Sequence, residues 1–371
     1  MHSVYLKTKI VSGDGSLQVL SAYKNQKILL VCDAFLLKSG GVEQLLRAVD
    51  NSCEVQIFSE VVPDPPISVV AKAVSQFFRF GPQIIIAMGG GSAIDTAKGI
   101  VYFAKQMAEK QSIRLIAVPT TSGTGSEVTS VTVLTEPEKK IKHMIIDQAI
   151  VPDEAILDAS LTLSVPPAIT ANTGIDVLTH ALEAYVATGA NPFTDAMAEK
   201  SVEFIHSSLL TCYHDGSNRQ AREKMHEAST FAGIAFDQAG LGIAHSLAHQ
   251  LGGTFHIAHG LANALVLREV ILYNSADPKA RFKYADIARC TGICPGGESD
   301  EQALMALLEY IKGLKAEMGM ANSIRECGVT LNEFEASVED VAANSLKDRC
   351  TLSNPTKINV ENAVKILKSL Y

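Results

Sequence analysis

The sequence predicts a two-domain protein, with an α/β N-terminal domain built on a parallel sheet and an all-α C-terminal domain. The chain of 371 residues is too long for one ordinary hydrophobic core, so two domains are expected. Its character also changes near Pro166 and Pro167: short β-rich runs alternate with helical segments before them, and long amphipathic stretches follow. We therefore place the α/β domain at residues 1–165 and the all-helical domain at residues 166–371.

The alternation in the first domain predicts how its sheet is built. The β-rich runs are separated by segments long enough to be crossover helices, which is typical of parallel strands with helices on both faces of the sheet. The expected strands cover residues 27–35, 54–61, 83–92 and 114–121, and the expected helices cover 70–80 and 95–108. In the second domain, amphipathic helices are expected at 193–210, 302–318 and 359–371.

Two pairs of residues at helical spacing give the clearest indication of chemistry. Asp176 and His180 are four positions apart, and so are His245 and His249. Residues i and i+4 lie about one turn apart on the same helix face, so both members of a pair can point at one ion. A lone HxxxH is more often structural than metal-binding, but the upstream Asp176 and His180 favour a metal site here.

A fifth residue, His259, follows His249 by ten positions, across Gly252 and Gly253. The glycine pair predicts a helix stop and a chain reversal, so a helix and a returning loop are expected to close the site. Imidazole and carboxylate ligands suit iron or zinc, whereas sites for calcium or magnesium are built from oxygen. Spacing alone does not decide whether His249 is a metal ligand or a proton-transfer group.

Two other uses of these residue types are not expected. Zinc proteases with HxxxH need Glu directly after the first histidine as general base, and that position is Ser246. The seven cysteines are odd in number and scattered, which argues against a disulfide framework. Cys290 and Cys294 form CxxxC, which we interpret as structural thiols rather than as a metal clip.

Composition and charge favour a small-molecule partner. The net charge of −8 and a pI near 5.7, without long basic runs, argue against nucleic acid and anionic lipid. No apolar run reaches the roughly eighteen residues of a membrane span, and the first residues lack the apolar core of a signal peptide. We therefore expect a soluble cytoplasmic protein with no membrane and no nucleic-acid partner.

Glycines between an expected strand and an expected helix form a candidate phosphate site. The third expected strand runs into Gly89, Gly90, Gly91 and Ser92, and Asp95 follows on the helix. Bare backbone lets N–H groups approach a phosphate, and the helix dipole favours an anion there. The pattern is not GxGxxG, so the usual dinucleotide fingerprint does not apply, and a flexible turn is the alternative.

A second loop of small and hydroxyl-bearing residues directly follows the next expected strand and contains Thr120, Thr121 and Thr124. Such loops at the carboxyl ends of two parallel strands mark the crevice where open α/β sheets bind nucleotides. Asp33 ends the first expected strand, where a carboxylate can accept hydrogen bonds from an adenine-ribose hydroxyl and would repel a 2′-phosphate. Asp33 therefore favours NAD(H) over NADP(H), with turn capping as its alternative role.

The chain resembles the iron-containing, group III alcohol dehydrogenases of the dehydroquinate synthase-like fold in five blocks: TKIVSGDGSL, GGGSAIDTAK, PTTSGTGSEVTS, NTGIDVLTHALEAYV and AHQLGGTFHIAHGLANAL. The resemblance covers almost the whole chain. It implies metal ligands, a proton relay and a cofactor site at matching positions: Asp176, His180, His245 and His259 as ligands, His249 as relay, Gly90, Gly91 and Ser92 at the pyrophosphate, Thr120, Thr121 and Thr124 around the cofactor, and Lys142 near the nicotinamide ribose. Asp33 and Asp95 complete the cofactor candidates. Asp64, in VPDP, stands where many members have Asn, so its role is open.

The resemblance implies an enzyme that interconverts a short-chain aldehyde and a primary alcohol with NAD(H) and Fe²⁺, with Zn²⁺ as the alternative metal. Within the family, three blocks look most like the 1-propanol dehydrogenases of propanediol-utilising microcompartments: CDAFLLKSG, DVLTHALEAYVA and HGLANALVL. Propionaldehyde and 1-propanol are therefore the expected substrates, and ethanol, lactaldehyde with 1,2-propanediol, and 1,3-propanediol are alternatives. We also expect a homodimer or larger homo-oligomer, with encapsulation among microcompartment shell or enzyme partners as a further hypothesis.

Two rival classes are weighed against a dehydrogenase. A lyase similar to dehydroquinate synthase would line its pocket with Lys and Arg for a carboxylate-bearing substrate, but the helical segments 169–186 and 231–253 contain neither residue. A metallohydrolase without a nucleotide would leave the loops at 89–92 and 119–127 unexplained. With four ligands already present, a fifth would crowd the position of the substrate oxygen, which favours His249 as the relay.

Overall fold

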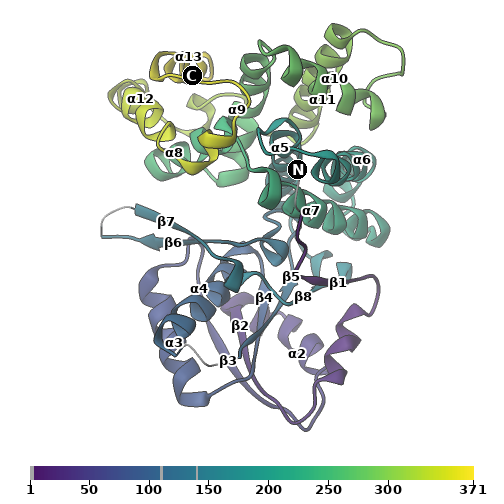
Figure 1. The fold of residues 1–371 in the computed structure, drawn as a ribbon, viewed down its shortest axis with the longest axis vertical. Helices are drawn as coiled ribbons and strands as arrows, with labels where there is room; N and C mark the ends of the chain where they lie inside the picture. The colour runs from purple at the N-terminus through teal and green to yellow at the C-terminus, as the bar shows by residue number, and fades with distance from the viewer. Residues whose placement is uncertain (1–3, 109–111, 139–140) are drawn as a thin grey trace. The chain divides into compact units, whose positions relative to one another are not determined.

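The computed structural model describes residues 4–108, 112–138 and 141–371. These residues form two compact units, one over Tyr5–Ser164 and one over Val165–Tyr371 together with Val4 (Figure 1). Each unit has hydrophobic cores of its own.

A six-stranded sheet forms the centre of the first unit, in the order β1-β8-β5-β4-β2-β3. Every pairing in this sheet is parallel, as the sequence predicted. The strands are β1 (Lys9–Ser12), β2 (Lys27–Asp33), β3 (Glu54–Val61), β4 (Ile84–Gly89), β5 (Arg114–Pro119) and β8 (Glu154–Leu157). The chain leaves β2 toward β3 on one side and returns to β4 on the other, so the topological switch point lies between β2 and β4, where open α/β sheets bind ligands.

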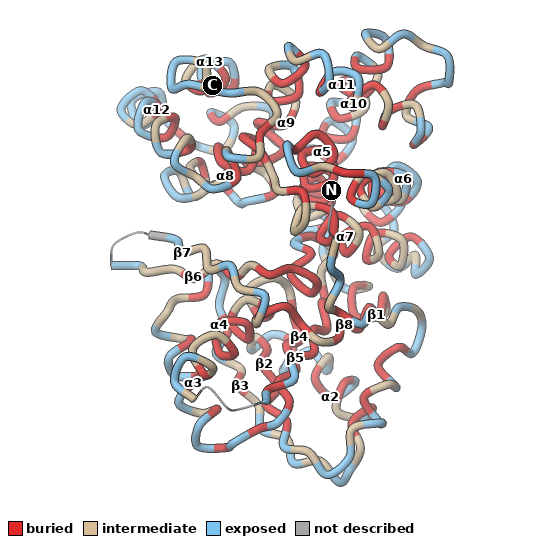
Figure 2. The backbone as a smooth tube through the Cα atoms, in the orientation of Figure 1, coloured by how far each residue is buried: buried red, intermediate tan, exposed pale blue. Residues whose placement is uncertain are grey.

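Successive side chains of these strands enter cores on opposite faces of the sheet. Leu29 and Ile85 pack in the core that includes α3 (Ile67–Phe80) and α4 (Gly91–Met107). Ile86 packs in the other core, with η1 (Ser16–Ala22) and α2 (Gly41–Leu46). Strand β4 is buried at every position (Figure 2), which is why its sequence is a continuous apolar run rather than an alternation.

The structure differs from the sequence prediction at several element ends. The predicted strands end two or three residues earlier than expected, at Asp33, Gly89 and Pro119. The chain leaves the sheet at these points to begin α1 (Ala34–Lys38), α4, or the loop before η2 (Ser126–Val128). Two short strands of the sheet, β1 and β8, were not predicted, so Asp33 ends the second strand of the chain rather than the first.

A two-stranded antiparallel hairpin, also absent from the prediction, accompanies the main sheet. It consists of β6 (Val131–Glu136) and β7 (Ile141–Ile146), with Thr135 opposite Lys142. The backbone N–H of Thr135 donates to the carbonyl of Pro65 at 2.9 Å, and this hydrogen bond ties the hairpin to the loop after β3. The remaining short elements of this unit are η3 (Gln148–Ile150) and η4 (Ala159–Thr162).

The described residues of the second unit form helices joined by turns and loops, without a strand, as the sequence predicted. Its helices are α5 (Pro167–Val186), α6 (Pro192–His214), α7 (Arg219–Ala239), α8 (Ile243–Phe255), α9 (His259–Asn274), α10 (Pro278–Cys290), α11 (Asp300–Glu317), α12 (Leu331–Ser345) and α13 (Val360–Ser369), with η5 (Arg325–Cys327) and η6 (Arg349–Ser353) between them. Helix α5 is buried on all sides from Gly174 to Val186, so it is the central helix of this unit. Buried polar side chains on such a helix need partners or a function.

The turn between α8 and α9 corrects one expectation. Gly252 and Gly253 do not stop the helix: α8 continues to Phe255, and His256 ends it in the left-handed region, at φ 57°. A Cβ atom on Gly252 would lie 3.2 Å from the carbonyl oxygen of Ile257, so this glycine lets the returning chain approach closely. His259 is therefore the first residue of α9 rather than part of a loop.

Across the described parts of the chain, every helix is too short or too polar to cross a membrane.

Candidate functional site

Side chains from three helices converge in the second unit. Helix α5 supplies Asp176 and His180, one turn apart, and α8 supplies His245; their ligand atoms all lie within 4.8 Å of one another. Asp176 Oδ1 lies 3.8 Å from His245 Nε2 and 3.4 Å from Nε2 of His259, at the start of α9. Two atoms that both bind a first-row ion at about 2.1 Å are at most about 4.2 Å apart, so these distances fit one ion.

The contacts of Asn263 on α9 test whether these residues fit a cation. Its Nδ2 lies 2.7 Å from Asp176 Oδ1 and 3.3 Å from Nε2 of both His245 and His259. An amide NH₂ has two hydrogens, so it cannot satisfy three acceptors at once. The three atoms therefore surround a place that suits a positive charge, and a carboxylate with imidazoles suits Fe²⁺ or Zn²⁺.

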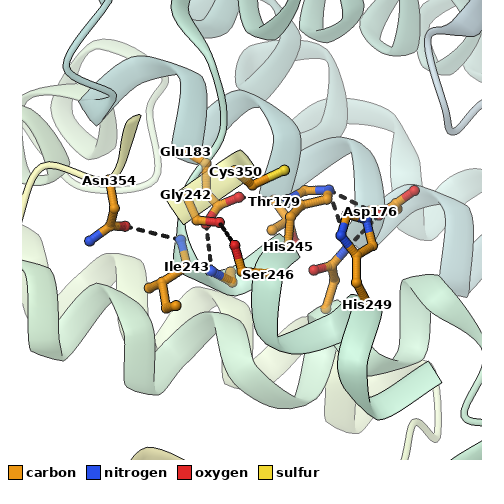
Figure 3. A network of polar contacts seen from close by, with 12 residues as sticks. Asp176, Thr179, Glu183, Gly242, Ile243, His245, Ser246, His249, Cys350 and Asn354 are labelled. Atoms are coloured by element: carbon orange, nitrogen blue, oxygen red, sulfur yellow. Dashed lines mark hydrogen bonds and ion pairs between the residues drawn. The ribbon is translucent and has the colours of Figure 1, made fainter. Parts of the chain in front are cut away.

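Glu183, one turn beyond His180 on α5, holds His245 from the other ring nitrogen. Its Oε2 lies 2.6 Å from His245 Nδ1, and its Oε1 accepts a hydrogen bond from the Ala244 N–H at 2.7 Å. Figure 3 shows Glu183 and Asp176 on either side of His245. A carboxylate bound to the far nitrogen of a ligating imidazole fixes its orientation and directs the Nε2 lone pair toward the metal position.

Burial and charge set the protonation of these groups in opposite directions. Burial lowers the pKa of His245 to about 4, despite the attraction of Asp176. Burial also opposes ionisation of Asp176, but the nearby histidines and the Asn263 hydrogen bond hold its pKa below the ordinary value. The site therefore presents neutral imidazole and ionised carboxylate at neutral pH, which are the forms that bind metal.

His249 lies beside this cluster but is hydrogen-bonded elsewhere. Its ring stacks on that of His259, with centroids 5.3 Å apart, and meets the His245 ring edge to face at 6.1 Å. Its Nδ1 lies 2.8 Å from Asp348 Oδ2, in the residue that precedes η6. The structure thus places His249 next to the candidate ligands with one ring nitrogen already engaged.

The candidate cofactor residues gather at one edge of the sheet in the first unit. Asp33, Gly89 and Pro119 end β2, β4 and β5, which are consecutive in the sheet. The Thr120 N–H donates to the Gly89 carbonyl at 3.0 Å. The predicted loops therefore lie side by side at the carboxyl ends of the strands, beside the topological switch point.

The glycines permit close contact between these two loops. A Cβ atom on Gly90 would lie 3.1 Å from Thr121 Oγ1, and one on Gly91 would lie 2.7 Å from Thr124 Cγ2. Gly91 begins α4 and Ser92 follows it, and no side chain caps this helix N-terminus or places an acid in its first turn. Its free N–H groups and the helix dipole suit the pyrophosphate of a dinucleotide.

Asp33 has the capping role that the sequence offered as its alternative, and its role in cofactor binding stays a prediction. Its Oδ1 accepts a hydrogen bond from the Leu36 N–H at 2.9 Å, so it caps α1. Its Oδ2 lies 4.0 Å from the position of a Cβ atom on Gly89, so the same carboxylate also faces the glycine loop.

Asp95 and Lys98, both on α4, are engaged within the protein. Asp95 accepts hydrogen bonds from Ser126 Oγ at 2.8 Å and from the Val133 N–H at 3.0 Å. Lys98 is fully buried and donates to the carbonyls of Thr129 and Val131 at 2.7 and 2.8 Å. Their described contacts tie residues 126–129 and β6 to α4.

Lys142 and Asp64 form an ion pair with each other. Lys142 Nζ, on β7, lies 2.7 Å from Asp64 Oδ1, in the loop after β3. Asp64 adopts the left-handed region at φ 49°, which Asn and Asp tolerate better than other non-glycine residues. The carboxylate that replaces the expected Asn thus has a partner in the structure.

Comparison with known proteins decides the family. Models of the iron-containing alcohol dehydrogenases match residues 7–159 and, for the C-terminal part of the family, residues 170–371. The chain is 44% identical over 370 residues to 1-propanol dehydrogenase PduQ of Citrobacter freundii and to that of Salmonella typhimurium, covering 100% of both proteins in each case. The chain belongs to the iron-containing alcohol dehydrogenase family.

A solved structure supports the same assignment for the whole fold. The crystal structure of a 1,3-propanediol oxidoreductase matches with a TM-score of 0.93 and 35% identity, covering 100% of both chains. The present chain is thus an iron-containing alcohol dehydrogenase, an NAD(H)-linked oxidoreductase that interconverts small aldehydes and alcohols with Fe²⁺. The family assignment favours a dehydrogenase over the lyase and metallohydrolase weighed from the sequence.

Three residues of the dehydrogenase site were missed from the sequence: Glu183, Asn263 and Asp348. Glu183 carried a signal, since it lies three positions after His180 on the same buried helix and a buried carboxylate needs a partner. Asn263 follows His259 by four positions and shares its helix face. Asp348 had no such signal, because its partner His249 is 99 positions away in the chain.

Proposed function

We propose that this enzyme reduces propionaldehyde to 1-propanol with NADH, and catalyses the reverse reaction, in a site whose metal is held by Asp176, His180, His245 and His259. The observation that carries the substrate is the 44% identity over the full length to two 1-propanol dehydrogenases. The convergence of one carboxylate and three imidazoles supports the metal assignment.

The protein supplies the setting for the reaction. When bound, the metal polarises the aldehyde oxygen as a Lewis acid and NADH supplies the hydride. Asp176 contributes one negative charge and the histidines contribute none, so a divalent ion there keeps a net positive charge facing the substrate oxygen. Glu183 keeps His245 oriented, and the glycine and threonine loops with Asp33 hold the dinucleotide.

His249 is the residue proposed to move the proton. Reduction of an aldehyde leaves an alkoxide that must be protonated, and a histidine beside the metal position can pass that proton to and from solvent. The His249 side chain is 24% exposed, whereas that of His245 is 2% exposed, so His249 alone of this pair reaches both the site and water.

The helices around the candidate metal favour an uncharged substrate. Neither α5 nor α8 contains Lys or Arg. An anionic substrate would need such cations close to its carboxylate or phosphate. A short aliphatic aldehyde needs only the metal and apolar surroundings, which supports propionaldehyde over charged aldehydes.

We also propose that the enzyme is a homodimer or larger oligomer that works inside a microcompartment. The resemblance to the 1-propanol dehydrogenases supports this setting. Light scattering of the purified protein would give its oligomeric state. Co-sedimentation with microcompartments, compared with the free protein, would test encapsulation.

An NADH absorbance assay with a panel of aldehydes tests the function. Apo-protein prepared by chelation is reloaded anaerobically with Fe²⁺ or Zn²⁺ and assayed with propionaldehyde, acetaldehyde, lactaldehyde and 3-hydroxypropionaldehyde. We expect kcat/KM to be highest for propionaldehyde and activity to require metal. A higher kcat/KM for either hydroxyaldehyde would reassign the substrate to a diol pathway, and turnover by the chelated protein would refute the metal role.

A further inference from the structure

The segment around Asp348 is fixed onto α8 by contacts distant in the sequence. Thr351 Oγ1, in η6, donates to Ser246 Oγ at 2.7 Å, and Ser246 lies directly after His245. Asn354 Oδ1 accepts a hydrogen bond from the Ile243 N–H at 3.1 Å, at the start of the same helix. Figure 3 shows Asn354 beside Ile243, and Cys350 near this end of α8. The segment is therefore held in register with the helix that carries His249.

Asp348 itself is positioned by both of its oxygens. Its Oδ1 accepts a hydrogen bond from the Cys350 N–H at 2.9 Å, which caps η6, and its Oδ2 lies 2.8 Å from His249 Nδ1. The Asp348 side chain is 11% exposed. A carboxylate held by its own backbone turn has little freedom to swing away from the imidazole.

The hydrogen bond fixes which nitrogen of His249 is available. An ionised carboxylate only accepts hydrogen bonds, so His249 Nδ1 must carry the proton that it donates to Asp348. The lone pair of the neutral imidazole is then on Nε2, which is left to accept and return a proton. The same division of labour operates in Ser-His-Asp enzymes, where the carboxylate sets the tautomer and orientation of the imidazole.

We propose that Asp348 is a positioning residue that holds His249 with Nε2 free for proton transfer during alcohol–aldehyde interconversion. This inference rests on the proposed role of His249 and extends it to a residue 99 positions away in the chain. Burial opposes ionisation of Asp348, but the hydrogen bonds from His249 and Cys350 outweigh it and lower the pKa of Asp348 to about 2. The carboxylate is therefore ionised at neutral pH.

The cluster has one other reading that the experiment must separate. His249, Asp348 and Cys350 offer ligand atoms within 4.8 Å of one another, a spacing that a second metal ion would also use. Burial raises the pKa of the Cys350 thiol well above its ordinary value, so it is a poor thiolate ligand. The structure therefore favours hydrogen bonding over coordination at these three residues.

Asp348→Asn is the matched change that tests the proposal. Asn caps a helix start as well as Asp does, so the turn at η6 is kept. Its amide NH₂ can donate to His249 Nδ1, which would move the ring proton to Nε2 and block proton acceptance there. We compare Asp348→Asn, Asp348→Ala, His249→Ala and the double variant His249→Ala/Asp348→Asn. The control is Asp277→Asn, which changes the capping Asp of α10, whose carboxylate accepts a hydrogen bond from the Ala280 N–H.

The variants are measured by kcat and KM for the aldehyde, the Kd for NADH by fluorescence, the metal content and the solvent deuterium isotope effect. We expect Asp348→Asn and Asp348→Ala to lower kcat by at least about tenfold, and by no more than the about 10²–10⁴-fold typical of losing the general acid–base group itself. KM, the Kd for NADH and the metal content should stay within about twofold of the wild-type values. The isotope effect on kcat should rise, because a slowed proton transfer limits the rate more strongly.

The double variant separates positioning from general structural damage. If Asp348 acts through His249, adding Asp348→Asn to His249→Ala should lower kcat no further, whereas independent effects would multiply. If Asp348→Asn keeps full activity while His249→Ala has a reduced kcat, the inference about Asp348 is wrong and the proposed relay role of His249 still stands. Full activity of His249→Ala, or loss of one metal equivalent from it, overturns the proposed relay role as well. Loss of a second metal equivalent in Asp348→Asn would show that Asp348 binds a metal ion and does not position His249.

Discussion

Asp33 has two carboxylate oxygens in different surroundings, one capping α1 and the other facing the glycine loop. Asp33→Ser should separate these roles, because Ser keeps the cap but removes the charge. We expect the preference for NADH over NADPH, as a ratio of kcat/KM values, to fall about tenfold or more, equivalent to about 1.4 kcal/mol. Asp33→Gly should lower the same preference for NADH over NADPH by a similar factor. An unchanged ratio in both variants would place the 2′-hydroxyl of the cofactor elsewhere.

His259 is the candidate ligand most open to solvent, with a side chain 42% exposed against 5% for Asp176. His259→Ala should therefore remove metal and turnover while leaving the fold largely intact. We expect the dialysed variant to retain less than about a tenth of the wild-type metal, with an unchanged far-UV circular dichroism spectrum. His214→Ala, an exposed histidine on α6, is the control and should keep its metal. Full occupancy in His259→Ala would remove it from the ligand set.

The residues that the sequence could identify are those that share an element. Asp176 and His180 are linked by helical spacing alone, which is a local property of the chain. Glu183 is 62 positions from His245, Asn263 is 87 positions from Asp176, and Asp348 is 99 positions from His249. Such contacts depend on how the helices pack, which periodicity does not specify.

At the scale of elements, the start of α4 and the loop after β5 are packed as one unit. Gly91→Ala would place a Cβ atom 2.7 Å from Thr124 Cγ2, so one of the two segments must shift. We expect Gly91→Ala to lower the free energy of unfolding by about 1–3 kcal/mol, the usual cost of overpacking, and to weaken NADH binding. Adding Thr124→Ser removes the clashing methyl group and should restore part of both losses. Without such recovery, the effect would come from the helix start itself.

Element ends show where local patterns stop being informative. The strands β1 and β8 have four residues each and pair with distant segments, so their short sequences do not distinguish them from loops. Gly252 was interpreted as a helix stop because glycine often ends helices, but here it permits the approach of the Ile257 carbonyl. A glycine that serves close packing and one that serves a turn look the same in a sequence.

At the scale of the whole molecule, the candidate metal ligands lie in Val165–Tyr371 and the candidate cofactor residues in Tyr5–Ser164. Fold class could be predicted because it depends on patterns repeated along each half: apolar strand runs alternating with helices before Pro166, and amphipathic helices after it. The order of strands in the sheet could not be predicted, because the pairing of β1 with β8 joins segments 145 positions apart.

The division of sites between the two units predicts which segments each ligand stabilises. A ligand that binds only the folded state adds stability of about 2.7 kcal/mol at a free concentration 100-fold above its Kd, so amides that exchange through opening of the site slow about a hundredfold. Hydrogen exchange followed by mass spectrometry should show this protection in α5, α8 and α9 when metal is added to chelated protein, with β2, β4 and β5 unchanged. NADH should protect peptides of β4, the start of α4 and the loop after β5. His259→Ala provides the control, because added metal should no longer slow exchange in it. Equal protection of both units by metal alone would show that the metal site and the sheet open as one cooperative body.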